Sequence, residues 1–288
     1  MYLCIGKPRG EPRPIFIVNN ILSMGSTIVT LTTDWGYNDF FAGSVKGKLY
    51  SYIPGVQVVD ITHGIPVFQT IRATFVVRHS CFDFPPGTIH IIDVCSSQSV
   101  EHPFIVAECA GQYFICTDNG LPAAVFGSKE YKAVVIDGIW LDTDSQNFAA
   151  RDLFCKVASL LAQGTPLSEL GYPAESLCPA TPFVTATFDN YIKVYVAYVD
   201  TYGNCYLNIT FDEFESYRQG RRFEMQVHEF RISRIVSSYI EPNPTASPVR
   251  SPILTVSSTG HLELAMPYAN AAGLCNLQTS ETFVVRFL

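Results

Sequence analysis

Residues 27–36 read Thr-Ile-Val-Thr-Leu-Thr-Thr-Asp-Trp-Gly, a β-branched apolar run that leads directly into a carboxylate and a glycine. The run predicts a buried strand over 27–32. Asp34 then lies just past the strand, where ligands bind in α/β sheets, and Gly36 lets another group approach closely. A second stretch repeats the arrangement, with the run 194–199 followed by Asp-Thr-Tyr-Gly-Asn over 200–204. Asp34 and Asp200 are therefore the first carboxylates to consider.

The segments that follow the first stretch alternate between strands and helices up to about residue 180. Apolar runs predict strands over 27–32, 57–61, 88–93, 104–109, 113–117 and 133–136. Apolar residues at three- and four-residue spacing predict helices over 39–53, 67–82, 120–126 and 150–163. This alternation is typical of an α/β domain with a mostly parallel sheet, which we assign to residues 26–180.

Residues 181–288 contain almost only short strands separated by turn residues. The strands are expected over 185–188, 192–198, 206–210, 222–227, 230–235, 253–257, 262–266 and 282–287. The pattern predicts a smaller all-β domain, a barrel or a sandwich, with the boundary near 177–183. The stretch 241–251, with three prolines, is expected to be a surface loop. Residues 1–25 are expected to form an N-terminal extension, the alternative being a true start at Met24.

Composition excludes several classes of protein. With 288 residues, 48% hydrophobic and 16% charged, the chain is long enough for two packed domains. A net charge of −7, with Arg221-Arg222 as the one adjacent basic pair, argues against nucleic-acid binding. No apolar run reaches the roughly 18 residues of a membrane helix. Nine scattered cysteines without a C-x-x-C pair indicate free thiols in a cytoplasmic protein.

Seven short motifs occur along the chain in a fixed order. They are Thr-Thr-Asp-Trp-Gly (32–36), Gly-Ser-Val-Lys-Gly (43–47), Val-Val-Asp-Ile-Thr-His-Gly-Ile-Pro (58–66), Phe-Pro-Pro-Gly-Thr-Ile-His (84–90), Thr-Asp-Asn-Gly-Leu (117–121), Val-Asp-Thr-Tyr-Gly-Asn (199–204) and Leu-Glu-Leu-Ala (262–265). In this order, over about 26–288, the chain resembles the S-adenosyl-L-methionine hydroxide adenosyltransferases, which are related to the fluorinating and chlorinating adenosyl enzymes. One such motif would be a weak signal, whereas seven in order are a strong one.

The resemblance implies an enzyme in which water or hydroxide attacks C5′ of the ribose of S-adenosyl-L-methionine and releases adenosine and L-methionine. Such a reaction depends on positioning and on desolvating the nucleophile. No metal and no organic cofactor is implied. The resemblance also implies a homotrimer whose pockets lie between the α/β domain of one subunit and the β domain of the next. Asp34 and Asp200 would then meet across a subunit interface.

In the first domain the resemblance assigns substrate-binding roles to three residues, and Asn119 is a further candidate from its turn sequence. Asp34 would accept hydrogen bonds from the ribose diol, because the two oxygens of a carboxylate can take both donors. The alternative for Asp34 is a helix cap or a turn residue. Trp35 and Phe68 would wall the ribose and the sulfonium, or else belong to the ordinary core. Asn119, in a turn, would also face the pocket.

In the second domain the resemblance places Asp200 on the methionine ammonium, Tyr202 on the adenine face and Asn204 on a base edge. The same residues also form a good β-turn sequence, and turn and site are expected to coincide. Ser258 would contact the methionine carboxylate, and the backbone from Met266 to Tyr268 would meet the adenine edge. Halide-using relatives carry an arginine next to that serine, where this chain has Thr259.

The reaction centre departs from the family pattern. Hydrolase members carry an Asp followed by a glycine-rich loop, then an Arg, and later a His in a His-Gly-Arg-Asp stretch. Here Asp93 is followed by Val-Cys-Ser-Ser, no arginine occurs near 100–102, and Ala149 occupies the histidine position. Asp93 remains to orient a water, with His102 as a candidate to restore charge and Ser96 as a candidate hydroxyl donor.

The remaining polar residues near strand ends have structural interpretations. The spacing of His63 and His90 fits no zinc site, and we expect packed or capped histidines. Arg151-Asp152 is expected to start a helix as an ion pair or to form part of the pocket wall.

Two functions are left open by the sequence. The first is an S-adenosyl-L-methionine hydrolase, weakened by the two altered positions. The second is a protein that binds S-adenosyl-L-methionine or adenosine and has lost the chemistry. Detection of adenosine and methionine as products distinguishes them.

Overall fold

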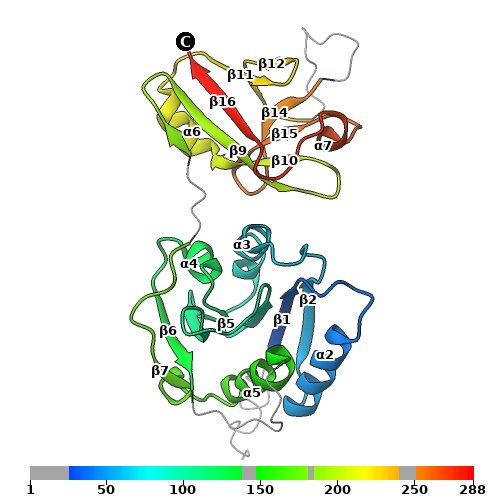
Figure 1. The fold of residues 1–288 in the computed structure, drawn as a ribbon, viewed down its shortest axis with the longest axis vertical. Coiled ribbons are helices and arrows are strands. Elements are labelled where there is room, and N and C mark those ends of the chain that lie inside the picture. Colours follow the sequence, from blue (N-terminus) through cyan, green and yellow to red (C-terminus); the bar gives the residue numbers. More distant parts are fainter. Residues whose placement is uncertain (1–25, 138–146, 181–184, 240–250) are drawn as a thin grey trace, which may run out of the picture.

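The computed structural model describes residues 26–137, 147–180, 185–239 and 251–288. The expected N-terminal extension and nearly all of the expected loop 241–251 lie outside these residues. Two bodies are visible in Figure 1, each built around its own sheet. None of the helices in the described ranges is both long and apolar enough to cross a membrane.

The first sheet has seven strands with helices on both faces. In spatial order the strands are β2 (Gln57–Thr62), β1 (Ile28–Thr33), β3 (Ile89–Asp93), β5 (Gln112–Thr117), β4 (Phe104–Cys109), β6 (Tyr131–Ile136) and β7 (Gly171–Pro173). Alternate strand residues pack on opposite faces, so that two separate cores form. One core includes α2 (Phe41–Tyr52) and α5 (Cys155–Ala162), and the other includes α3 (Thr70–Arg78) and α4 (Leu121–Phe126).

This sheet is mixed, so the prediction of a mostly parallel sheet was wrong. The pairs β1–β2, β1–β3 and β3–β5 are parallel, whereas β4 runs antiparallel to both β5 and β6, and β7 is antiparallel to β6. The reason lies in the turn between β4 and β5. Ala110 and Gly111 have φ of 52° and 75°, and two positive φ values in a two-residue loop are typical of a tight hairpin.

The second sheet forms a β-rich domain within residues 185–239 and 251–288. Its strands are β8 (Ala186–Thr187), β9 (Tyr191–Val199), β10 (Cys205–Thr210), β11 (Phe223–Val227), β12 (Phe230–Ile232), β13 (Ile235–Val236), β14 (Ile253–Val256), β15 (His261–Ala265) and β16 (Thr282–Phe287). The spatial order is β12-β11-β16-β9-β10-β15-β14-β13, with β8 also paired to β9.

Two helices in this domain were not predicted. They are α6 (Phe211–Arg218) and α7 (Ala271–Leu274). A capping box begins α6, since Thr210 accepts from the Glu213 N–H while the Glu213 carboxylate accepts from the Thr210 N–H. The spacing Thr-x-x-Glu is the sequence signal for such a start. Three further turns are helical, over Cys81–Asp83, Ala150–Phe154 and Leu167–Glu169.

The two bodies contact each other through α3. The ring of Phe75 stacks on that of Tyr198 at 4.8 Å and 7°, and it also meets the rings of Tyr206 and His261. Arg72 lies over the Tyr198 ring at 4.7 Å. Helix α3 therefore contacts the β domain at one part of its length, and it begins close to the strand-end residues described next.

Candidate functional site

Three strands of the first sheet end beside one another and bring their polar residues together. Thr33 of β1 pairs in register with Asp93, the last residue of β3, and Asp34 follows directly. Asp118 follows β5, which pairs with β3. The carboxyl ends of parallel strands meet at one edge of a sheet, which is where ligands bind in such folds.

Asp34 ties two neighbouring loops to its own strand. Its Oδ2 accepts hydrogen bonds from the Phe68 N–H at 2.9 Å and from the Cys95 N–H at 3.3 Å. Both residues have the left-handed backbone that side chains disfavour, with φ of 64° at Phe68 and 51° at Cys95. Non-glycine residues held in this region cluster at functional sites. Oδ1 of Asp34 has no donor among the described residues, so acceptor capacity is left for a ligand.

Asp93 is a buried carboxylate held by an indole. Asp93 is only 7% exposed, and its Oδ2 accepts a hydrogen bond from Trp35 Nε1 at 2.8 Å. Burial raises the pKa of Asp93 to about 6, against the opposing effect of hydrogen bonds from Ser96 and Trp35 and with a small further rise from Asp34. No cation pairs with Asp93 among the described residues. A carboxylate of this kind is a better proton acceptor than an ordinary aspartate.

The loop after β3 is fastened from β5 and the residues that follow it. Ser96 Oγ lies 2.9 Å from Thr117 Oγ1. Asn119 donates from Nδ2 to the carbonyls of Val94 at 3.1 Å and Cys95 at 3.3 Å. The structure therefore brings Ser96 and Asn119 together with Asp34, Trp35 and Asp93.

His102 lies at the surface beside Asp118, and no hydrogen bond among the described residues joins it to Asp93. It is an exposed residue whose Nδ1 is 3.0 Å from the Asp118 carbonyl and 3.6 Å from Cys178 Sγ. Its recorded contacts are with these groups and not with Asp93. Its assignment to the reaction centre stays a prediction.

Ala149 directly follows Phe148, which packs against the indole of Trp35. Phe148 meets the Trp35 ring edge-on at 5.5 Å, and Arg151 lies over the Phe148 ring at 5.3 Å. Arg151 forms a two-pronged ion pair with Asp152, at 2.6 and 2.8 Å. The interpretation as an ion pair is confirmed, and the guanidinium is committed to Asp152.

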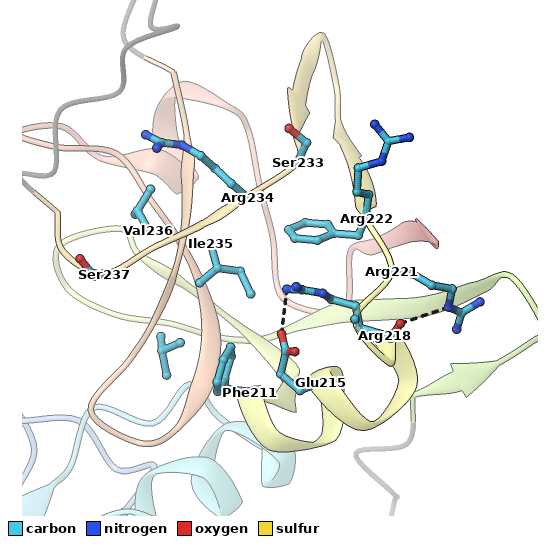
Figure 2. A pocket seen from close by; sticks show the side chains of 13 residues that line it. Phe211, Glu215, Arg218, Arg221, Arg222, Ser233, Arg234, Ile235, Val236 and Ser237 are labelled. Carbon is cyan, nitrogen blue, oxygen red and sulfur yellow. Dashed lines mark hydrogen bonds and ion pairs between the residues drawn. The ribbon is translucent and has the colours of Figure 1, made fainter. Parts of the chain in front are cut away.

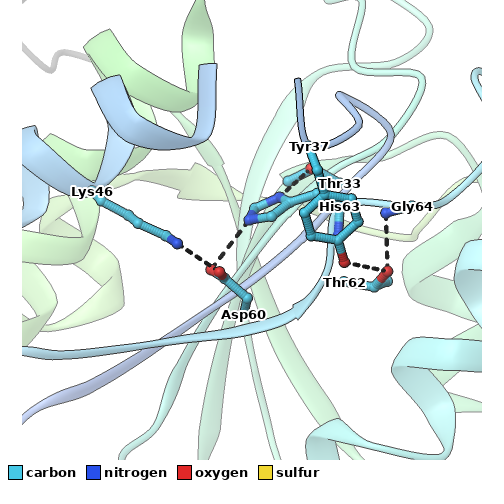
Figure 3. A network of polar contacts seen from close by, with 7 residues as sticks. All are labelled: Thr33, Tyr37, Lys46, Asp60, Thr62, His63 and Gly64. Atoms are coloured by element: carbon cyan, nitrogen blue, oxygen red, sulfur yellow. Dashed lines mark hydrogen bonds and ion pairs between the residues drawn. The ribbon is translucent and has the colours of Figure 1, made fainter. Parts of the chain in front are cut away.

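A polar network centred on the buried His63 lies beside the indole of Trp35, and Figure 3 shows the contacts of this network. The His63 ring stacks on Trp35 at 5.9 Å and 11°. Its Nδ1 lies 2.7 Å from Thr33 Oγ1, and its Nε2 lies 3.2 Å from Asp60 Oδ1. Asp60 also accepts from Lys46 Nζ at 2.5 Å. His63 is the packed histidine that was expected, and His90 is likewise packed, with Nδ1 at 2.7 Å from Thr30 Oγ1.

In the β domain, Asp200 begins the turn that its sequence predicts. The Gly203 N–H donates to the Asp200 carbonyl, and the Asn204 N–H donates to Asp200 Oδ1 at 2.9 Å. Gly203 has a φ of 84°, and a Cβ there would come within 2.1 Å of Asn270 Oδ1. Glycine is required at this position because the turn packs against the start of α7.

Several residues assigned to the substrate are exposed at the surface of the single chain. The exposed fractions are 74% for Phe68, 79% for Tyr202 and 89% for Tyr268, and Tyr268 has a φ of 56°. Ser258 is also exposed, whereas Met266 is buried. Asp34, Trp35 and Asp93 form the Asp34 group, and Asp200 and Asn204 form the Asp200 group. No hydrogen bond among the described residues joins one group to the other.

Sequence reasoning missed a second carboxylate near Asp200. Glu263, from the Leu-Glu-Leu-Ala motif, is fully buried, and its Oε1 accepts from the Tyr239 hydroxyl at 2.9 Å. Its Oε2 is buried without a partner among the described residues. Burial, with a contribution from Asp200, raises the pKa of Glu263. A glutamate at a strand position between two leucines was the available signal.

Both parts of the chain match domain models of one protein family. Models of the SAM hydroxide adenosyltransferase N-terminal and C-terminal domains match residues 29–171 and 194–284. The chain is 26% identical over 265 residues to the (R)-S-adenosyl-L-methionine hydrolase of Methanocaldococcus jannaschii, covering 87% of this chain and 92% of the relative. It is 29% identical over 216 residues to the hydrolase of the same name from Salinispora tropica, covering 70% and 81%.

More distant likenesses agree with these. A fluorinase from Actinoplanes is 22% identical over 292 residues, covering 91% of this chain and 98% of the relative. The crystal structure of an uncharacterized conserved protein from Thermotoga maritima superposes with a TM-score of 0.77 at 24% identity, over 90% of this chain and all of that one. This last likeness supports the fold.

Proposed function

The chain belongs to the SAM hydroxide adenosyltransferase family, and we propose that it is an enzyme that hydrolyses S-adenosyl-L-methionine to adenosine and L-methionine. The proposal rests chiefly on one observation. A buried carboxylate with a raised pKa, Asp93, lies at the same strand edge as a second carboxylate, Asp34, that retains acceptor capacity. A protein that only binds the ligand is not favoured by these relatives.

The reaction that we propose is a single displacement. A water held by Asp93 attacks C5′, the new O–C5′ bond forms as the C5′–S bond breaks, and methionine leaves as a neutral thioether. The proton of the water passes to Asp93. Asp34 holds the ribose hydroxyls, and Trp35 fixes the direction of Asp93 through its N–H. The positive sulfonium lies beside a desolvated carboxylate, which strengthens their attraction.

The raised pKa of Asp93 compensates in part for the histidine and the arginine that this chain lacks. Ala149 stands in place of a histidine, and no arginine occurs near 100–102. Asp93 therefore lacks the two side chains that would assist it in deprotonating the water. An ordinary aspartate, with a pKa near 3.9, is a poor base. Burial supplies part of the missing basicity.

This pKa sets an expected pH dependence. Asp93 must be ionised to accept a proton, and its pKa of about 6 lies above the ordinary range. The rate is therefore expected to rise between pH 5 and pH 7, and to fall about tenfold for each unit well below the midpoint. Initial rates across this range measure it. A flat profile from pH 4.5 to 7 would contradict the assignment of Asp93.

We also propose that the active form is a homotrimer in which Asp200, Tyr202, Asn204, Ser258, Met266 and Tyr268 of one subunit complete the pocket of another. The exposure of Phe68, Tyr202 and Tyr268 supports this, because these three aromatic side chains lie open in the single chain and would be covered in a shared pocket. The cytoplasmic location stays a prediction.

Mixing two inactive variants tests the shared pocket. Asp34→Ala and Asp200→Ala proteins are each expected to be inactive, since each removes one half of every site. After dissociation and reassembly together, about a quarter of the interfaces combine an intact Asp34 with an intact Asp200 under random mixing. Activity is expected to return to about that fraction. Complete inactivity of verified mixed trimers would contradict a shared pocket.

Product analysis tests the function itself. Purified protein is incubated with S-adenosyl-L-methionine, and adenosine and methionine are followed by chromatography. The two products are expected in equal amounts. Measurable binding of S-adenosyl-L-methionine without any product above an Asp93→Ala control would instead favour a binding protein.

A further inference from the structure

A groove in the β domain gathers arginine side chains, although the whole chain carries a net charge of −7. It has a volume of about 610 Å³ and lies between the end of α6 and the segment that joins β12 to β13 (Figure 2). Four arginines, Arg218, Arg221, Arg222 and Arg234, line it together with one carboxylate, Glu215. Positive charge concentrated in a concave surface of an acidic protein attracts anions.

The positive charge is only partly neutralised. Arg218 donates to Glu215 Oε1 at 2.9 Å, and its buried Nε has no hydrogen-bond partner among the described residues. Arg221 donates hydrogen bonds to three main-chain carbonyls, those of Tyr217, Arg218 and Asp189. These bonds fix the position of the guanidinium but do not neutralise its charge. Arg222 is exposed and forms no ion pair with a described residue.

The rest of the groove is apolar with hydroxyls at its margin. Phe223 and Val236 are buried beneath it, and Val256 contributes an exposed methyl surface. Ser233 lies between Arg222 and Arg234 in the view of Figure 2. Arginine binds phosphate oxygens through paired N–H donors, and an apolar surface beside it suits the organic part of a ligand.

We propose that this groove binds a small phosphorylated organic molecule, with its phosphate on Arg222 and its neighbours and its apolar part on the Phe223–Val256 side. The groove shares no lining residue with the Asp34 group or the Asp200 group. It is therefore a second site, and its occupancy does not depend on the hydrolase chemistry.

Calorimetric titration of the full chain with pyrophosphate and with phenyl phosphate, at constant ionic strength, tests the proposal. Both are expected to bind with one ligand per chain, and phenyl phosphate is expected to bind more tightly than methyl phosphate. Arg222→Gln is expected to weaken binding about tenfold or more, since it removes hydrogen bonds to a charged group. Arg286→Gln, which changes an exposed arginine on β16 outside the groove, is the matched control and is expected to bind normally.

Three outcomes would overturn the proposal. One is the absence of saturable binding at millimolar ligand. Another is an equal loss in Arg222→Gln and Arg286→Gln, which would indicate nonspecific charge. The third is competition by adenosine, which would place the anion at the strand-end site. Unchanged hydrolysis of S-adenosyl-L-methionine by Arg222→Gln is the expected check that the two sites are separate and that the variant is folded.

Discussion

Replacement of Asp93 by asparagine is expected to lower kcat for S-adenosyl-L-methionine hydrolysis by at least about 100-fold, because the proton acceptor is lost. Asparagine has the same shape, and its carbonyl oxygen can still accept from Trp35 Nε1, so the packing is preserved. The affinity for S-adenosyl-L-methionine is expected to change much less than kcat. Steady-state kinetics together with calorimetric binding measure both quantities.

The control for the Asp93→Asn variant is a change at Ser96, the hydroxyl residue next to Asp93. Ser96→Ala removes a hydrogen bond that lowers the pKa of Asp93, while leaving the carboxylate in place. It is expected to retain most of the activity and to move the acid limb of the pH profile upward. An Asp93→Asn enzyme within threefold of the native rate would show that the water is activated by another group.

Replacement of Asp34 by alanine is expected to weaken adenosine binding at least about 100-fold, since two hydrogen bonds from the ribose to a charged acceptor are removed. The change also releases the N–H groups of Phe68 and Cys95, both of which have a positive φ. Calorimetric titration with adenosine measures the affinity.

Thermal unfolding separates the two contributions of Asp34. Asp39→Ala removes an exposed carboxylate five residues away and is the matched control for charge. Asp34→Asn keeps one oxygen that can hold a loop N–H, and it is expected to unfold close to the native temperature while still binding adenosine weakly. Native adenosine affinity in Asp34→Ala would contradict the assignment of Asp34 to the ribose.

Local pattern predicted six of the seven strands of the first domain, because each of the six is a short apolar run bounded by turn residues, and it missed β7, which reads Gly-Tyr-Pro. It failed on their direction. The hairpin at Ala110-Gly111 depends on two positive φ values, and an alanine there gives no warning. Helix α6 was missed although Thr210 and Glu213 have the spacing of a capping box.

The candidate site was likewise predicted only in part. Asp34 was found from its residue type and its position at the end of a strand, and Trp35 and Asp93 were found from the family resemblance. The structure brings the three residues together. The loop contacts could not be predicted, because the bond from Phe68 to Asp34 joins residues 34 apart and the bond from Cys95 joins residues 61 apart. The raised pKa of Asp93 depends on burial by several segments at once, which no local pattern encodes.

The origin of the oxygen in the product tests the central claim most directly. The protein is incubated with S-adenosyl-L-methionine in water enriched in ¹⁸O, and the adenosine is analysed by mass spectrometry. Attack of water at C5′ predicts one ¹⁸O atom per adenosine, in the 5′-hydroxyl, and unlabelled methionine. Adenosine without label, or no adenosine from a folded protein that binds the substrate, would contradict the account.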